Sequence, residues 1–465
     1  MNCLGLRGIL LGLVILFQVG ADLVGLPVLK GLSGIAMAVY LVCVMRRVRW
    51  SRQAFLVVAV ALSAYALAMR DDGWDLVVVA GSAGAFVIAF FIALSSLRAA
   101  SSTSPAIRAC GLYLASRTPS LRYLALALGG HMFSLMLNYG SIPLLGNLVE
   151  QSETGPDGTY GNPVRVRRML LAIQRGFSTT LCWSPLAFSM AVGPTVVAGS
   201  SWEGTALMGA GAALLLGAVG WGVDLWFKPP RPPHAPPPPP PSGSWRSLLP
   251  LGVLLVVIFS AIALVQVATG LRTNVAVLLV VPLVSAGWIA VQAGRTSGLR
   301  AVPGGLRSRV AGYFTGELDG YCGEILLLSM AGYIGKLGGF LAQPLVTGHL
   351  IDLGALPPWM ILAGLVLAMP LAGQLGMHPI LAASLIGPLL PDAHLLGISP
   401  DLMLLAMCVG WAFGAVSCPF TATVLLVAVM GRVSALTVGW RWNGVYLALG
   451  GLAGLAYVLG MALLT

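Results

Sequence analysis

Apolar stretches separated by short polar loops recur from one end of the chain to the other. Most are about 20 residues long, which is the length an α-helix needs to cross a bilayer. The alternating pattern of outer-membrane barrel strands is absent. The pattern therefore predicts an all-α polytopic membrane protein with about 12–15 transmembrane segments. The longer segments are expected at 8–26, 28–46, 53–69, 74–97, 121–139, 169–199, 205–226, 247–270, 273–293, 322–343, 358–375, 402–430 and 441–463.

Three apolar pieces need a separate interpretation. Those at 142–150 and 377–390 are short for a spanning helix, so they are half-helices, re-entrant hairpins or short crossings within the protein. The first 20 residues resemble a signal peptide, with Arg7 before an apolar run. No small-residue cleavage site is clear and another apolar segment follows directly, so we expect a first transmembrane helix.

Two glycine–proline motifs each occur twice, about 235 residues apart. Gly140-Ser141-Ile142-Pro143 matches Gly376-Met377-His378-Pro379. The stretch from Gly176 to Pro185 likewise matches the stretch from Gly410 to Pro419. Glycine and proline interrupt helices, and interruptions at corresponding positions of two halves indicate the binding site of a transporter.

Charge refines this organisation. Only 9% of the residues are charged, and the net charge is +11. The arginines cluster in loops, which by the positive-inside rule are cytoplasmic, so the charge is a topology signal and does not indicate nucleic-acid binding. The cluster 165–168 places the start of the first broken helix inside, and Arg432 places the end of the second inside. We therefore expect two inverted repeats with broken or re-entrant helices, at 1–227 (with an extra N-terminal helix) and 247–465. A Pro-rich cytoplasmic linker at 228–246 joins them.

Small hydroxyl side chains gather at the breaks. A proline leaves the carbonyl four residues earlier without its helical donor. Such carbonyls and hydroxyls can coordinate a cation, and exposed half-helix N-termini attract an anion. The alternative is an ordinary kink, with each hydroxyl bonded back to its own helix. The candidate substrate- or ion-binding residues are Asn138, Ser141, Ser178, Thr179, Thr180, Ser184, Pro185, Lys336, His378, Ser417, Cys418, Pro419, Thr421 and Thr423.

Two of these candidates, a lysine and a histidine, can carry a positive charge. Lys336 lies inside an apolar segment, where a charged side chain is costly and indicates a functional site. The sequence leaves four roles open for Lys336. It attracts an anionic substrate, it replaces a coupling cation, it forms an ion pair with another helix, or its ammonium group extends to the membrane interface. His378 can exchange protons near neutral pH or be a hydrogen-bonded core residue. His131, seven residues before Asn138 on one helix face, is a further pathway candidate.

The paired motifs resemble the ion transporter superfamily, which includes dicarboxylate, citrate and arsenite permeases. The resemblance implies inverted repeats, each with a re-entrant hairpin and an unwound helix at the binding site. Sodium-coupled dicarboxylate members have Ser-Asn-Thr at the hairpin tips, and this sequence has no such triplet. Nucleobase and sulfate permeases, with seven-plus-seven inverted repeats, are a second family that the sequence resembles.

These observations favour a secondary active transporter of a small, anionic solute that works by alternating access. Proton coupling is favoured over sodium, and no cofactor, metal or catalytic residue is expected. We expect an integral protein of the bacterial inner membrane with a cytoplasmic N-terminus. Its partners are the solute and the lipid bilayer, and a homodimer is compatible with the sequence. The alternatives are a channel or a membrane enzyme acting on a lipid-linked substrate through Asp392, His394 and Asp401.

Overall fold

The computed structural model describes residues 3–102, 104–117, 121–153, 162–229, 243–298, 300, 302–347, 353–391 and 393–464. Every regular element in these ranges is helical. Eleven helical stretches are long and apolar enough to cross a membrane, which confirms an all-α polytopic membrane protein in contact with the bilayer. Most of the predicted linker, including its proline run at 236–241, lies outside the described residues.

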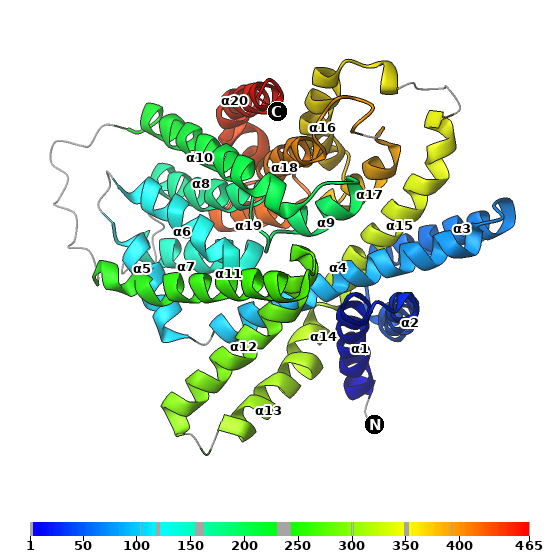
Figure 1. Cartoon of the computed structure of the whole chain (residues 1–465). Helices are drawn as coiled ribbons and strands as arrows, with labels where there is room; N and C mark the ends of the chain where they lie inside the picture. The colour runs from blue at the N-terminus through cyan, green and yellow to red at the C-terminus, as the bar shows by residue number, and fades with distance from the viewer. Residues whose placement is uncertain are drawn as a thin grey trace.

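A peripheral group of helices is contributed by the beginning and the middle of the chain. It comprises α1 (Cys3–Val24), α2 (Pro27–Val44), α3 (Trp50–Met69), α4 (Gly73–Ser102), α12 (Thr273–Ser297), α13 (Val302–Gly312), the π-helix η5 (Tyr313–Glu317), α14 (Leu318–Gly320) and α15 (Cys322–Thr347). Helix α4 is central to this group, since it packs against α1, α2, α3, α12 and α15. Figure 1 shows α12 and α13 as a pair that projects from the body of the molecule.

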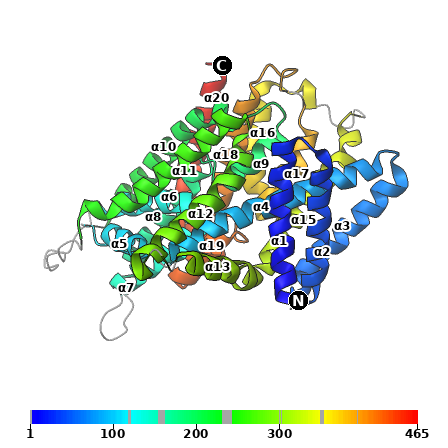
Figure 2. The ribbon, with the colours of Figure 1, turned by 60° about the horizontal axis from the view of Figure 1, so that its bottom comes forward.

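A core group contains both copies of the duplicated motifs. The first copy is α6 (Arg122–Leu137), α7 (Ser141–Glu153), α8 (Pro163–Thr180), α9 (Phe188–Val196) and α10 (Trp202–Trp226). The second copy is α16 (Pro358–Gln374), α17 (Pro379–Ile386), α18 (Pro400–Ser417), α19 (Ala422–Gly431) and α20 (Gly444–Ala462). In Figures 1 and 2 the cyan to green helices of the first copy lie beside the dark yellow to red helices of the second.

Two more helices and several short helical turns complete the described ranges. Helices α5 (Pro105–Ala115) and α11 (Leu249–Thr269) pack beside α6. The remaining helical turns are η1 (Met45–Arg47), η2 (Asn138–Gly140), η3 (Trp245–Leu248), η6 (Leu353–Ala355), η7 (Gly387–Leu389) and the π-helix η8 (Thr437–Trp442).

The two copies pack in the same internal order and exchange contacts. Helix α6 packs along α8, and α16 packs along α18. Across the copies, α7 contacts α19 while α17 contacts α9, and the closing helices α10 and α20 lie against each other. Broken helices α8 and α18 also meet directly. The segments predicted at 169–199 and 402–430 are therefore each two helices joined by an unwound stretch, and the two stretches belong to one packed unit.

Matched glycines allow this packing. A Cβ on Gly176 of α8 would lie 2.1 Å from the carbonyl oxygen of Ala127 on α6. A Cβ on Gly410 of α18 would lie 2.5 Å from the carbonyl oxygen of Val366 on α16. Both distances are impossible for a real side chain, so backbones approach closely at both positions, as small residues permit in membrane helices. The glycines that begin the duplicated broken-helix motif are thus explained by helix packing.

We expect Gly176→Ala and Gly410→Ala each to lower the stability of the purified protein by about 1–3 kcal/mol, because the added methyl group must push two helices apart. The measurement is the thermal midpoint in detergent. Gly217→Ala in α10 is the matched control, since nothing lies within 4 Å of its added Cβ. Equal midpoints for all three variants would contradict the close approach of these helix pairs.

Candidate functional site

The first break lies between Thr180, where α8 ends, and Phe188, where α9 begins. Pro185 has no N–H, so the carbonyl of Leu181 lacks the donor that a continuous helix would supply. The Ser189 hydroxyl donates to that carbonyl at 2.5 Å. The chain therefore satisfies the carbonyl that its own proline exposes.

The second break repeats this arrangement. Helix α18 ends at Ser417 and α19 begins at Ala422, with Pro419 between them. The carbonyl that Pro419 leaves without a donor is that of Ala415, and the Thr423 hydroxyl donates to it. Each acceptor lies four residues before its proline and each hydroxyl four residues after. The two breaks therefore have the same hydrogen-bond geometry as well as the same glycine and proline residues.

The other predicted hydroxyls of the first break bond locally. Ser178, Thr179 and Thr180 donate to the carbonyls of Arg175, Gly176 and Phe177, at 2.9, 2.8 and 2.7 Å respectively. Ser184 accepts the backbone N–H of Leu186 at 3.2 Å. All four are buried, as is Pro185. These local bonds are those expected for an ordinary helix kink, the alternative to a binding site. Each hydroxyl oxygen can still accept a further hydrogen bond.

The hydroxyls and thiol of the second break also bond to groups nearby. Thr421 donates to the Cys418 carbonyl at 2.9 Å, and the Cys418 thiol donates to the Gly373 carbonyl of α16 at 2.8 Å. Ser417 accepts from the side-chain amide of Gln374 at 3.4 Å. Thus α16 is hydrogen-bonded to the unwound end of α18, near the second GxxP motif.

A histidine connects α6 to the first break. The Trp183 indole N–H donates to Nε2 of His131 at 3.2 Å, so the ring hydrogen of the neutral imidazole lies on Nδ1. Nδ1 lies 2.8 Å from the hydroxyl oxygen of Thr179 and donates to it. The two rings are stacked with centroids 5.8 Å apart. A proton added to Nε2 would replace an acceptor by a donor and break the bond to Trp183.

The first GxxP motif lies at the turn between α6 and α7. Asn138 has φ 51° and ψ −137°, a conformation that side-chain-bearing residues rarely adopt. Backbone strain of this kind occurs often at functional sites. Ser141 is buried, and its hydroxyl lies 2.8 Å from that of Ser134 on α6. Next to Asn138, Tyr139 donates to Glu324 of α15 at 2.7 Å, which connects this turn to the peripheral group.

The second GxxP motif begins α17. Gly376 has φ +84°, and His378 caps the helix by accepting the N–H of Ile380 at Nδ1, at 3.3 Å. Because Nδ1 is the acceptor, protonation there would remove the cap. His378 is half-buried and lies on the turn that follows α16.

Lys336 lies apart from the two breaks. It is on α15, which packs against α17 and α4. The side chain is half-buried, and Nζ lies 4.9 Å from the centre of the Phe340 ring. No carboxylate among the described residues forms an ion pair with it. Lys336 therefore lies on the helix that packs against α17, the helix that begins at the second GxxP motif.

A polar cluster that the sequence analysis missed joins the two copies. The Asn443 amide, which is fully buried at the end of η8, donates to the side-chain oxygen of Gln174 on α8 at 3.1 Å and to the Val416 carbonyl of α18 at 3.2 Å. Its side-chain oxygen accepts from Nε of Arg175 at 3.0 Å. One side chain thus holds both broken helices. An arginine inside the apolar segment 169–199 carries the same signal that identified Lys336.

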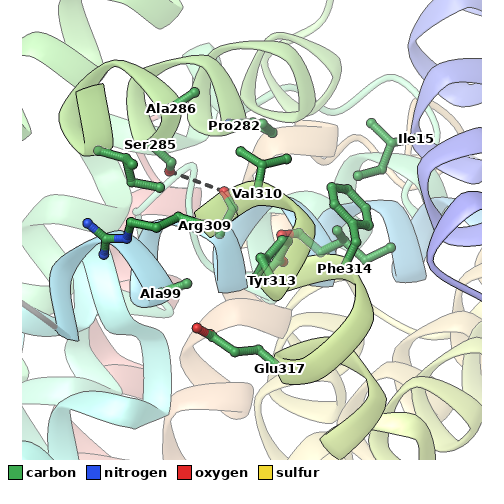
Figure 3. Close-up of a pocket in the computed structure, with 13 residues that line it drawn as sticks. Ile15, Ala99, Pro282, Ser285, Ala286, Arg309, Val310, Tyr313, Phe314 and Glu317 are labelled. Carbon is green, nitrogen blue, oxygen red and sulfur yellow. Dashed lines mark hydrogen bonds between the residues drawn. The ribbon is translucent and has the colours of Figure 1, made fainter. Parts of the chain in front are cut away.

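A pocket of about 170 Å³ lies elsewhere. It is enclosed by α1, α4, α12, α13 and η5, with Arg309 and Glu317 among mainly apolar lining residues (Figure 3). It belongs to the peripheral group and contains none of the predicted site residues. The candidate site therefore rests on the two breaks and the cluster between them.

The structure also locates the residues that were considered for metal binding and for catalysis. No three His, Cys, Asp or Glu side chains in the described ranges are grouped to hold a metal ion. Of the three residues considered for an enzyme, Asp392 lies outside the described residues. The Asp401 carboxylate accepts the backbone N–H of Ser201 at 2.7 Å, so it joins the start of α18 to the start of α10.

We expect Ser189→Ala and Thr423→Val each to destabilise the protein by about 1–3 kcal/mol, because each leaves a buried carbonyl without a donor. Thermal midpoints in detergent measure the effect. Thr195→Val is the control, since Thr195 is exposed and its hydroxyl bonds within its own helix, α9. Variants as stable as the control would show that the freed carbonyls have other donors.

No protein-family model matches the sequence, and no curated protein matches it. Among solved structures, the chain is similar to the YdaH transporter of Alcanivorax borkumensis, with a TM-score of 0.55 and 16% identity over 89% of this chain and 99% of that chain. MtrF of Neisseria gonorrhoeae, described within a class of antimetabolite efflux pumps, has a TM-score of 0.49 and 11% identity over 88% and 95% of the two chains. At 16% identity the likeness to YdaH shows a shared fold that extends over nearly the whole of both chains. Membership of the ion transporter superfamily stays a prediction.

Proposed function

We propose that this protein is a secondary active transporter of a small anionic solute, which it moves by alternating access. The observation that carries the proposal is the pair of breaks with the same proline-to-hydroxyl geometry in two helices that pack together. Discontinuous helices from two repeats surround the substrate site in many secondary transporters. The fold shared with the YdaH transporter supports the same class of function.

We further propose that the two copies are inverted repeats. The basic run before α8 and Arg432 after α19 favour the same membrane side for the start of one broken helix and the end of the other. The reciprocal contacts of α7 with α19 and of α17 with α9 are those that a two-fold relation between the copies would produce. In this arrangement the N-terminus is cytoplasmic and the membrane is the bacterial inner membrane. The boundaries at 1–227 and 247–465 belong to this proposal, and a homodimer is compatible with it.

The proposed coupling ion is the proton. His131 accepts a hydrogen bond from Trp183 in the first break, and His378 accepts one from the first turn of α17. Protonation of the accepting ring nitrogen would release the bond, so a proton could change the packing at either position. The missing Ser-Asn-Thr triplet argues against sodium.

The proposed function predicts a loss of transport in proteoliposomes when residues of the two breaks, or Lys336 on α15, are replaced. We expect Ser184→Ala, Thr421→Ala and Lys336→Leu each to reduce transport of responding carboxylates at least about tenfold, equivalent to ~1.4 kcal/mol of lost binding. The substrate is found first by screening small carboxylates for electrical currents on a solid-supported membrane. Thr195→Ala is the control for folding and reconstitution. Full transport by all three variants would mean that the site is wrongly assigned.

Ion dependence gives a second prediction. An inward pH gradient of about one unit should drive uptake, because one proton moving down it supplies about 1.36 kcal/mol. Replacing sodium by potassium should leave the rate unchanged. Uptake that needs sodium and ignores the pH gradient would exclude proton coupling. Currents without coupled accumulation would indicate a channel, and conversion of a lipid-linked substrate would indicate an enzyme.

A further inference from the structure

Arg175 is a buried charge on the first broken helix. Its side chain is on α8, five residues before that helix ends, and only 4% of the residue is exposed. All of its hydrogen-bond partners in the described structure are neutral, and its guanidinium lies 4.6 Å from the centre of the Tyr446 ring. These partners are Asn443 Oδ1 at 3.0 Å, the Tyr123 hydroxyl at 3.3 Å, the Gly220 carbonyl at 3.5 Å and the Trp442 carbonyl at 3.4 Å.

A second arginine on the same helix provides a contrast. Arg168 lies seven residues before Arg175, nearly two turns away and on the same helix face. It forms two hydrogen bonds of 2.7 Å with the carboxylate of Asp224 on α10. Arg175 has no such carboxylate among the described residues, although a charge inside a protein normally acquires one. Its positive charge is therefore solvated by neutral groups and left uncompensated.

The repeated architecture does not require this arginine. Counting back from each proline by ten residues gives Arg175 in the first copy and Val409 in the second. Val409 is fully buried in α18, so the equivalent position is an ordinary apolar packing position there. Placing a cation at one of two matched positions adds a property that the fold itself does not need.

The surroundings of Arg175 have an excess of hydrogen-bond donors. Gln174 is fully buried; its side-chain oxygen accepts from Asn443, while its Nε2 has no partner among the described residues. A buried N–H without an acceptor is unfavourable. A carboxylate or another small anion supplies both the acceptor and the negative charge that this cluster lacks.

The unwound stretch at 181–187 begins about 9 Å along the chain from Arg175 at helical rise. A charge acts over this distance with much less screening in a membrane interior than in water. We propose that Arg175 is the fixed positive charge that makes the site at the first break select small anions, carboxylates above all. This inference rests on the proposed function, because it names what selects the solute at the proposed site.

The test compares carboxylates with their neutral amides. Purified protein in detergent is titrated with acetate, butyrate and succinate, and separately with the matching amides, at constant ionic strength and pH. Binding is measured by the shift of the thermal midpoint. For at least one pair, we expect the wild type to bind the carboxylate about tenfold more tightly, equivalent to ~1.4 kcal/mol. Arg175→Gln should bring that ratio close to one.

Two further variants separate charge from folding. Arg165→Gln removes an exposed arginine from the same helix and should keep the wild-type ratio. Arg175→Lys keeps the charge and should also keep the preference for carboxylates over amides. This variant tests the proposal if Arg175→Gln is not monodisperse. The proposal is overturned if the wild type prefers no carboxylate, if Arg175→Gln keeps the full preference, or if Arg175→Lys loses it.

The same measurements distinguish this inference from the proposed function, since binding in detergent needs neither a gradient nor transport. Carboxylate binding that depends on Arg175 in a protein that transports nothing would refute the transporter and leave the charge selectivity standing. Transport of a neutral or cationic solute without any carboxylate preference would refute the selectivity, and with it the anionic solute of the proposed function, and would leave secondary active transport standing.

Discussion

The packed unit depends on the need to satisfy backbone carbonyls where water is scarce. A proline within a membrane helix removes one donor, and an unpaired carbonyl in hydrocarbon is strongly unfavourable. This chain meets the constraint twice with the same device, a hydroxyl four residues beyond the proline that donates to the carbonyl four residues before it. Each helix can therefore be interrupted without leaving its exposed carbonyl unpaired, so the unwound stretches can be held inside the protein.

Close helix packing then holds the two interruptions in place. Gly176 and Gly410 let α8 and α18 approach α6 and α16 at backbone distance, so each broken helix has a rigid neighbour. Asn443 adds a polar connection between the copies, because one buried amide bonds to both α8 and α18. A motion of one broken helix against the other would have to change these bonds. The cluster is thus a physical link between the copies, of the kind through which coupling between sites is carried.

Two of the positions at which the copies differ carry a charge or a titratable ring. The first copy has Arg175 where the second has Val409, and Ile142 where the second has His378. Packing explains the matched glycines, and backbone satisfaction explains the matched prolines and hydroxyls. Neither packing nor backbone satisfaction explains the unmatched residues. The residues that the two copies share therefore account for structure, and the residues that differ are where solute choice and coupling are proposed to arise.

The sequence alone determined the fold class, the positions of the apolar segments and the existence of two broken helices, because hydrophobic length and proline chemistry are local properties. It also indicated hydroxyls near the breaks, but could not tell whether Ser189 or Ser184 would satisfy the freed carbonyl. Lys336 and Arg175 carry the same sequence signal, an isolated charge in an apolar segment. Only the tertiary structure separated them, since burial and partners depend on which helices meet. Lys336 lies on the helix that packs against α17, which begins at the second GxxP motif, and Arg175 lies between the two copies. Both placements depend on contacts between distant segments, which are set by packing and not by local sequence pattern.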